Sequence, residues 1–88
     1  MTHGLKILKE YADRVLSGEK RFEVRWDDRH FQAGDDVLYT VVDDKTREPA
    51  GHPLDGSRWI VTYVQHGLGL RRGFCAFGIE EYGEGGAE

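Results

Sequence analysis

Four ionisable side chains lie close together in one short segment of this chain: Lys20, Arg21, Glu23 and Arg25. From Arg21 to Trp26, charged and apolar residues alternate, which is the period of two expected for a strand with one polar and one apolar face. A partly desolvated lysine beside a carboxylate can act as an acid, a base or a nucleophile. Charge of both signs on what otherwise has the pattern of a core strand therefore indicates a site.

The geometry of this segment leaves two interpretations open. Strand parity places Lys20 and Glu23 on opposite faces, unless a bulge or twist at the start of the strand turns Lys20 inward. If the two side chains meet, they form a candidate catalytic pair. The alternative is a structural set of ion pairs between Lys20, Glu23 and Arg25 that closes the mouth of a barrel.

The same segment also has the residue types of a phosphate site. Arg21, Arg25 and Arg29 predict a basic ridge, because the planar fork of a guanidinium group suits phosphate oxygens. Lys6 joins this ridge if the first strand pairs with the second. Trp26 stands at the end of the strand, where it is equally suited to packing in the core and to stacking on an unpaired base.

The elements that position these residues follow from the hydrophobic periodicity. Strands are predicted for residues 1–8, 20–26, 37–42, 59–64 and 74–79. Apolar residues spaced by three and four predict one helix from Leu8, and Gly18 marks its end. The run at 37–42 predicts a buried central strand, and 59–64 is apolar on both faces. Residues 45–57 contain both prolines and few apolar groups, which predicts a long loop.

One early helix followed by further strands predicts an α+β fold, a small barrel of about five strands with the helix packed at its opening. Eighty-eight residues are enough for one domain, for which we predict the bounds 1–82. The acidic, glycine-rich residues 83–88 are predicted to be a disordered tail. Tyr39 and Trp59 are assigned to the core, and Cys75 is predicted to be a small buried apolar residue.

Several short motifs resemble those of the ASCH domain family, a PUA-like group of β-barrels, and especially its short stand-alone bacterial and phage branch. The motifs are His3-x-Leu5-Lys6-Ile7, Gly18-x-Lys20-x-x-Glu23-x-Arg25, Asp28-Arg29, Phe31-Gln32-x-Gly34-Asp35, and Gly69-Leu70 to Gly73-Phe74. The resemblance implies a PUA-like barrel with a cleft between the helix and the second strand. It also implies binding of RNA or action on modified nucleosides.

One branch of the resemblance implies an enzyme. ASCH-type amidohydrolases that remove acyl groups from modified cytidine use a lysine, a threonine and a glutamate. Lys20 matches their lysine, but Glu23 replaces the threonine three residues on. Glu80 corresponds to their glutamate only by rough position.

Composition narrows the classes of function. A net charge of −4 argues against general nucleic-acid binding, so any RNA contact must come from a local patch. Cys75 has no internal disulfide partner, which indicates a reducing, cytoplasmic setting. No apolar run approaches the roughly 20 residues of a membrane span. The histidines and Cys75 lack the close spacing of common metal sites, so we expect no metal and no cofactor.

Our leading hypothesis from the sequence is a module that binds single-stranded RNA or a nucleotide-like ligand. In this hypothesis Lys6, Lys20, Arg25 and Arg29 form the ligand site with Glu23 and Trp26: Lys20, Arg25 and Arg29 contact phosphate, Glu23 accepts hydrogen bonds from a base or sugar, and Trp26 stacks. One alternative is a small hydrolase of acylated nucleosides with Lys20 and Glu23 as catalytic residues. Another alternative is a protein-interaction domain that adds an edge strand to a partner.

Overall fold

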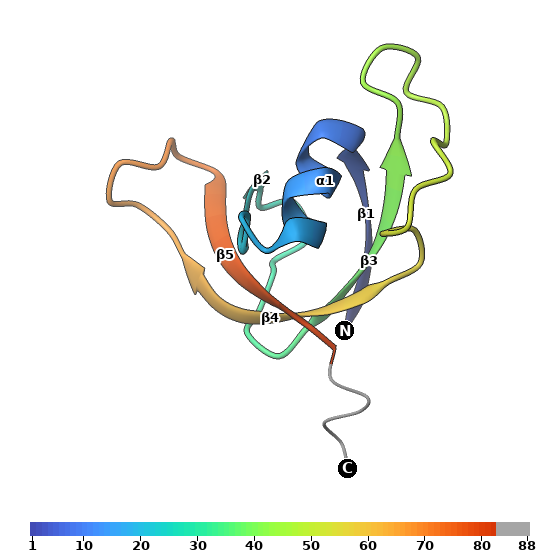
Figure 1. Ribbon diagram of the computed structural model, residues 1–88. Helices are drawn as coiled ribbons and strands as arrows, with labels where there is room; N and C mark the ends of the chain where they lie inside the picture. Colours follow the sequence, from blue (N-terminus) through green and yellow to red (C-terminus); the bar gives the residue numbers. More distant parts are fainter. Residues whose placement is uncertain (83–88) are drawn as a thin grey trace.

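Five strands form one mixed sheet in the computed structural model, which describes residues 1–82 (Figure 1). The strands are β1 (Thr2–Leu8), β2 (Phe22–Trp26), β3 (Asp36–Val42), β4 (Arg58–Gln65) and β5 (Phe74–Glu81). Their order in the sheet is β1-β3-β4-β5-β2, with β1 parallel to β3 and the other neighbours antiparallel. The sheet curls into a half-barrel, and its two edge strands are β1 and β2.

The helix α1 (Lys9–Ser17) follows β1 directly and lies on the concave side of the sheet (Figure 1). It ends as the sequence predicts, because Gly18 adopts a left-handed conformation with φ 88° and donates its N–H to the Val15 carbonyl. Ala12 and Val15 are buried, whereas Leu16 is about half exposed. The apolar stripe that covers the barrel opening is therefore narrower than the spacing predicts.

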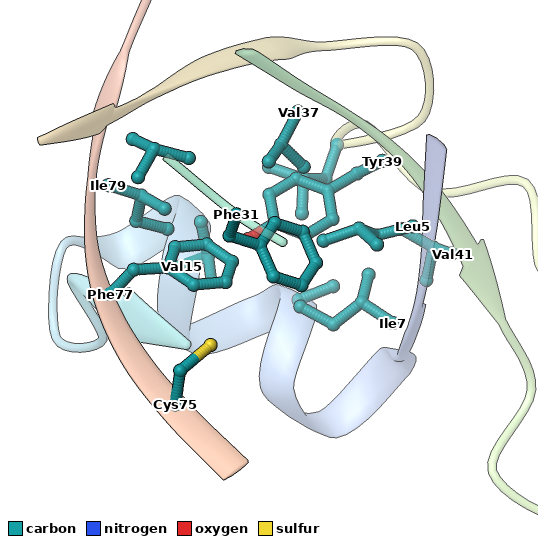
Figure 2. Packing of buried hydrophobic residues seen from close by; sticks show 13 residues of the cluster. Leu5, Ile7, Val15, Phe31, Val37, Tyr39, Val41, Cys75, Phe77 and Ile79 are labelled. Atoms are coloured by element: carbon teal, nitrogen blue, oxygen red, sulfur yellow. The ribbon is translucent and has the colours of Figure 1, made fainter. Parts of the chain in front are cut away.

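One apolar cluster fills the space between the helix and the sheet (Figure 2). It consists of Leu5, Ile7, Ala12, Val15, Phe31, Val37, Tyr39, Val41, Leu54, Val61, Cys75, Phe77 and Ile79. Tyr39 and Cys75 lie in it as predicted, and Trp59 is partly buried against it. Burial, reinforced by the charge of Asp27 and a hydrogen bond to it, raises the pKa of the Cys75 thiol to about 11. Leu54 anchors the long loop between β3 and β4 in the core.

The predicted α+β fold, with one helix and about five strands, is confirmed for the described residues. The prediction that the apolar side of the second strand faces the core is wrong. Phe22, Val24 and Trp26 point outward and are each about half exposed, whereas Glu23 is buried. The strand also begins at Phe22, two residues later than predicted. The cause is the set of hydrogen-bond donors that surrounds the Glu23 carboxylate, described below.

A second correction concerns β4, which was predicted to be apolar and enclosed on both faces. Val61 is fully buried, but Tyr63 is 64% exposed. Val61 and Tyr63 have the same strand parity, but the register of β4 against β5 shifts between Val61 and Val64, and this irregularity turns Tyr63 outward. Among the described residues no second sheet covers that outer face. The disordered tail predicted for residues 83–88 lies outside the described residues.

The edge strands β1 and β2 are joined by side chains instead of a backbone ladder. Arg25 Nη2 donates to the Lys6 carbonyl at 2.9 Å, and Arg29 Nη1 donates to the Gly4 carbonyl at 2.6 Å. Gly4 and Lys6 are two residues apart, so their carbonyls point to the same edge of β1. We call this pair of contacts the arginine seam. Lys6 therefore does lie beside β2, although the two strands do not pair.

The loop between β2 and β3 is fixed to β1 by a buried carboxylate. Asp35 Oδ2 lies 2.8 Å from His3 Nε2 and accepts the Gln32 backbone N–H at 3.0 Å. The His3 ring packs on Phe31, with 4.7 Å between ring centroids. Burial by itself raises the pKa of Asp35, but the hydrogen bonds from His3 and Gln32 outweigh it, and the pKa is lowered.

We predict that this carboxylate makes folding stability depend on pH. Because the Asp35 pKa is lower in the folded chain, its contribution is present at neutral pH and is lost as the pH falls through the folded value. Asp35→Asn should reduce the free energy of unfolding at pH 7 by about 1–3 kcal/mol, measured by denaturant titration. The difference from the wild type should shrink below about pH 4.

The exposed Asp28 provides the control, since its side chain takes part in no hydrogen bond or ion pair within residues 1–82. Asp28→Asn should change stability by less than about 0.5 kcal/mol. An Asp35→Asn deficit that is the same at pH 7 and pH 3 would contradict the role of the charge.

Candidate functional site

A pocket of about 420 Å³ opens between α1, the end of β1 and β2. Its lining consists of Lys6, Ile7, Leu8, Tyr11, Lys20, Phe22, Glu23, Val24 and Arg25. This is the position of the cleft that the family resemblance implies, between the helix and the second strand. Four of the six residues predicted for a ligand site lie in the lining: Lys6, Lys20, Glu23 and Arg25.

The buried carboxylate of Glu23 organises this pocket. Its Oε2 accepts a hydrogen bond from the Tyr39 hydroxyl at 2.5 Å and lies 3.4 Å from Lys20 Nζ. Its Oε1 accepts one from Arg25 Nε at 3.1 Å. The Glu23 side chain is only 5% exposed, so these three donors replace the water that a carboxylate normally requires.

Lys20 reaches Glu23 because it precedes the strand. The chain turns at Gly18, and the Lys20 backbone N–H donates to the Arg14 carbonyl at 3.0 Å, so strand parity does not yet apply at this position. Lys20 Nζ also donates to the Phe22 carbonyl at 2.6 Å and lies over the Phe22 ring, 5.1 Å from its centroid. The Lys20 side chain is therefore held at the pocket with 16% of its surface exposed.

Tyr39 is a partner that the sequence assigned to packing alone. It is 1% exposed on β3, and its hydroxyl faces Glu23 across the interior. Burial raises its pKa far above the ordinary value, and the charge and hydrogen bond of Glu23 raise it further. Tyr39 therefore remains a hydrogen-bond donor at any physiological pH. In the sequence, the signal for this role was a tyrosine hydroxyl within the mostly apolar run at 37–42.

The remaining predicted residues lie outside the pocket lining. Arg29 is bound to the Gly4 carbonyl in the arginine seam, and Arg21 donates Nε to the Gly18 carbonyl at 3.2 Å. Trp26 is 56% exposed on the outer face of β2 and packs edge-on against Phe74. The three arginines thus each bind a different backbone carbonyl, those of Gly18, Lys6 and Gly4.

The hydrolase set implied by the resemblance is present only in part. Lys20 and Glu23 meet, but Glu80 lies on β5 opposite Ile60 of β4 and is not among the residues that line the pocket. Tyr39 is the side chain that completes the contacts of Glu23 instead.

These features define a small α+β half-barrel domain with a pocket in which three cationic side chains accompany one buried carboxylate. The chain belongs to the family described as a domain of unknown function, DUF3850, whose family profile matches residues 2–79. No curated protein matches the sequence significantly. Within the part of the chain that the structure describes, no helix has both the length and the apolar character needed to cross a membrane.

We predict that the Tyr39 hydroxyl contributes to stability through Glu23. Tyr39→Phe removes a hydrogen bond to a buried charge and should lower the free energy of unfolding by about 1.5–3 kcal/mol, as measured by denaturant titration. Tyr63→Phe is the matched control, because the Tyr63 hydroxyl donates to Gln65 Oε1 on the exposed face. It should cost less than about 0.5 kcal/mol. Equal losses in the two variants would show that Glu23 does not depend on Tyr39.

Proposed function

We propose that this chain is an ASCH-type, PUA-like module that binds single-stranded RNA or a nucleotide-like ligand in the pocket between α1 and β2. The observation that carries the proposal is the charge of the lining. Lys6, Lys20 and Arg25 bring three positive charges against the single negative charge of Glu23. This local excess supports an anionic ligand even though the whole chain is acidic.

The donors that remain free support phosphate as the anion. The Lys6 side chain is exposed and takes part in no ion pair within residues 1–82, since only its backbone carbonyl is bound by Arg25. Arg25 uses Nε and Nη2 for Glu23 and Lys6, and its Nη1 has no partner among the described residues. A lysine and one guanidinium nitrogen at the mouth of the pocket suit a phosphate group.

The apolar wall supports a base beside the phosphate. Ile7, Leu8 and Tyr11 line the side of the pocket formed by β1 and α1. A carboxylate offers about four acceptor positions. Glu23 accepts hydrogen bonds from Tyr39 and Arg25 and forms an ion pair with Lys20, which leaves an acceptor position for a base or sugar donor. Trp26, exposed outside the pocket, would stack on a further nucleotide of a longer strand.

The test is the salt dependence of RNA binding. Lys6→Ala should weaken the binding of a mixed-sequence single-stranded RNA oligomer, measured by fluorescence anisotropy at several salt concentrations. If Lys6 contacts one phosphate, the slope of log K against log salt should become shallower by about 0.7. Arg25→Ala combined with Lys6→Ala should weaken binding further, because the pocket of the double variant loses a second cation.

Lys45→Ala is the matched control, since Lys45 is exposed on the loop after β3 and is absent from the pocket lining. It should leave the slope unchanged. A Lys6→Ala variant that binds as tightly as Lys45→Ala, with the same slope, would remove the phosphate role. Unfolding curves of each variant separate a loss of binding from a loss of the fold.

A second candidate function is hydrolysis of an acylated nucleoside, and the contact between Lys20 and Glu23 favours it. In this reaction water adds across the amide bond of acetylcytidine, the C–N bond breaks, and acetate and cytidine are released. A lysine amine next to a carboxylate is suited to moving the proton from water to the leaving nitrogen.

We expect the wild type, if it is such an enzyme, to convert acetylcytidine to cytidine and acetate in a one-dimensional NMR time course. Lys20→Ala should abolish the conversion. Lys9→Ala should preserve it, because Lys9 pairs with Asp13 on the exposed face of α1. Absence of cytidine signals with the wild type would count against the enzyme.

A further inference from the structure

A second cluster of chemically active side chains lies apart from the pocket. Asp27, His66 and Cys75 each offer one ligand atom, and these atoms all lie within 4.8 Å of one another. Asp27 Oδ2 and His66 Nε2 are 2.9 Å apart. Carboxylate, imidazole and thiolate are the three side-chain groups that bind Zn²⁺ in proteins.

The backbone brings these residues together. The Asp27 N–H donates to the Gly73 carbonyl at 2.8 Å, which continues the pairing of β2 with β5 past its last register pair. Gln65 of β4 pairs with Ala76 of β5, so His66 follows the strand directly beside Cys75. The cluster is therefore set by the sheet register of three segments. Asp27 and His66 are separated by 39 positions in the sequence, so local spacing does not reveal the cluster, and no metal site was expected there.

The separations are close to those that a tetrahedral ion requires. Zn–S bonds of about 2.3 Å and Zn–N or Zn–O bonds of about 2.0–2.2 Å place neighbouring ligand atoms roughly 3.3–3.6 Å apart. The longest distance in the cluster must therefore shorten by no more than about 1.5 Å. The His66 side chain is 58% exposed and free to make this adjustment, whereas Cys75 is fixed in the core.

The carboxylate is already oriented for a cation. Asp27 Oδ1 accepts the Phe31 backbone N–H at 2.9 Å, which leaves Oδ2 directed at His66. Such supporting hydrogen bonds hold ligands in position in metal sites. The carboxylate and the thiolate together carry two negative charges, which match a divalent ion, and the exposed side of His66 leaves a fourth position open to water.

We propose that Asp27, His66 and Cys75 bind Zn²⁺ or a similar divalent transition-metal ion, with water as the fourth ligand. Cys75 loses its thiol proton to solvent on binding, and His66 binds as the neutral imidazole. This site shares no residue with the lining of the pocket between α1 and β2. A result that contradicts metal binding therefore leaves the RNA hypothesis unaffected, and the reverse also holds.

The test is titration of the full chain with Co²⁺, followed by competition with Zn²⁺. A Co²⁺–thiolate bond gives an intense near-ultraviolet charge-transfer band, which should saturate at one ion per chain and disappear when Zn²⁺ displaces Co²⁺. Because the wild-type thiol is protonated before binding, the titration should also release a proton in weakly buffered solution. Cys75→Ser should abolish the band.

The controls distinguish a built site from loose binding by any histidine. His66→Ala keeps Cys75 and the core intact, and it should weaken Co²⁺ binding by about tenfold or more. His52→Ala is the comparison, because His52 Nε2 also pairs with an aspartate, Asp13 Oδ1 at 2.7 Å, but has no cysteine beside it within residues 1–82. The His52 side chain is more buried than that of His66, 6% against 58% exposed, so unfolding curves of both variants accompany the titrations. It should bind Co²⁺ like the wild type. Absence of the thiolate band in the wild type, or equal losses in the two histidine variants, would overturn the proposal.

Discussion

The burial of one carboxylate determines much of this structure. Removing an ionised carboxylate from water costs several kcal/mol unless its charge and lone pairs are matched. Glu23 meets this requirement with the Tyr39 hydroxyl, Lys20 Nζ and Arg25 Nε. These donors come from β3, from the turn after α1 and from β2, so one side chain connects three parts of the chain. The outward direction of Phe22, Val24 and Trp26 is a consequence of this arrangement.

The same constraint explains how an open sheet is completed. A half-barrel leaves two edges with unpaired backbone groups, which are prone to pair with other chains. In this domain the edges lie opposite each other, and Arg25 and Arg29 provide donors to the free carbonyls of β1. Arg25 can reach across because Glu23 fixes its Nε and leaves its terminal nitrogens directed at β1. Side-chain contacts thus take the place of a fifth strand pairing, which would close the sheet.

The sequence predicted which segments form the helix and the strands more accurately than which side of each strand is buried. Period-two and helical spacing located all five strands and the helix, and Gly18 marked the helix end. Periodicity does not determine which side of a strand faces inward. For β2 the apolar residues suggested the wrong side, because Glu23 is buried by partners such as Tyr39 that are distant in the sequence. Four of the six predicted ligand residues line the pocket. Lys20 does so because of the turn at Gly18, which strand parity does not describe, whereas Glu23 and Arg25 are alternate residues of β2 and share one face of it. The Asp27, His66 and Cys75 cluster depends on strand register, which no local spacing contains.

The arginine seam has a mechanical consequence. Backbone ladders open cooperatively, whereas the edge between β1 and β2 is held by two guanidinium groups that can each exchange one acceptor for another. Arg25 belongs both to this edge and to the pocket wall, because its Nη2 holds the Lys6 carbonyl and its side chain lines the pocket. A change in the direction of this one guanidinium group would therefore alter both the wall of the pocket and the contact between β1 and β2. The side chain that holds the open side of the half-barrel together is therefore also part of the wall of its pocket.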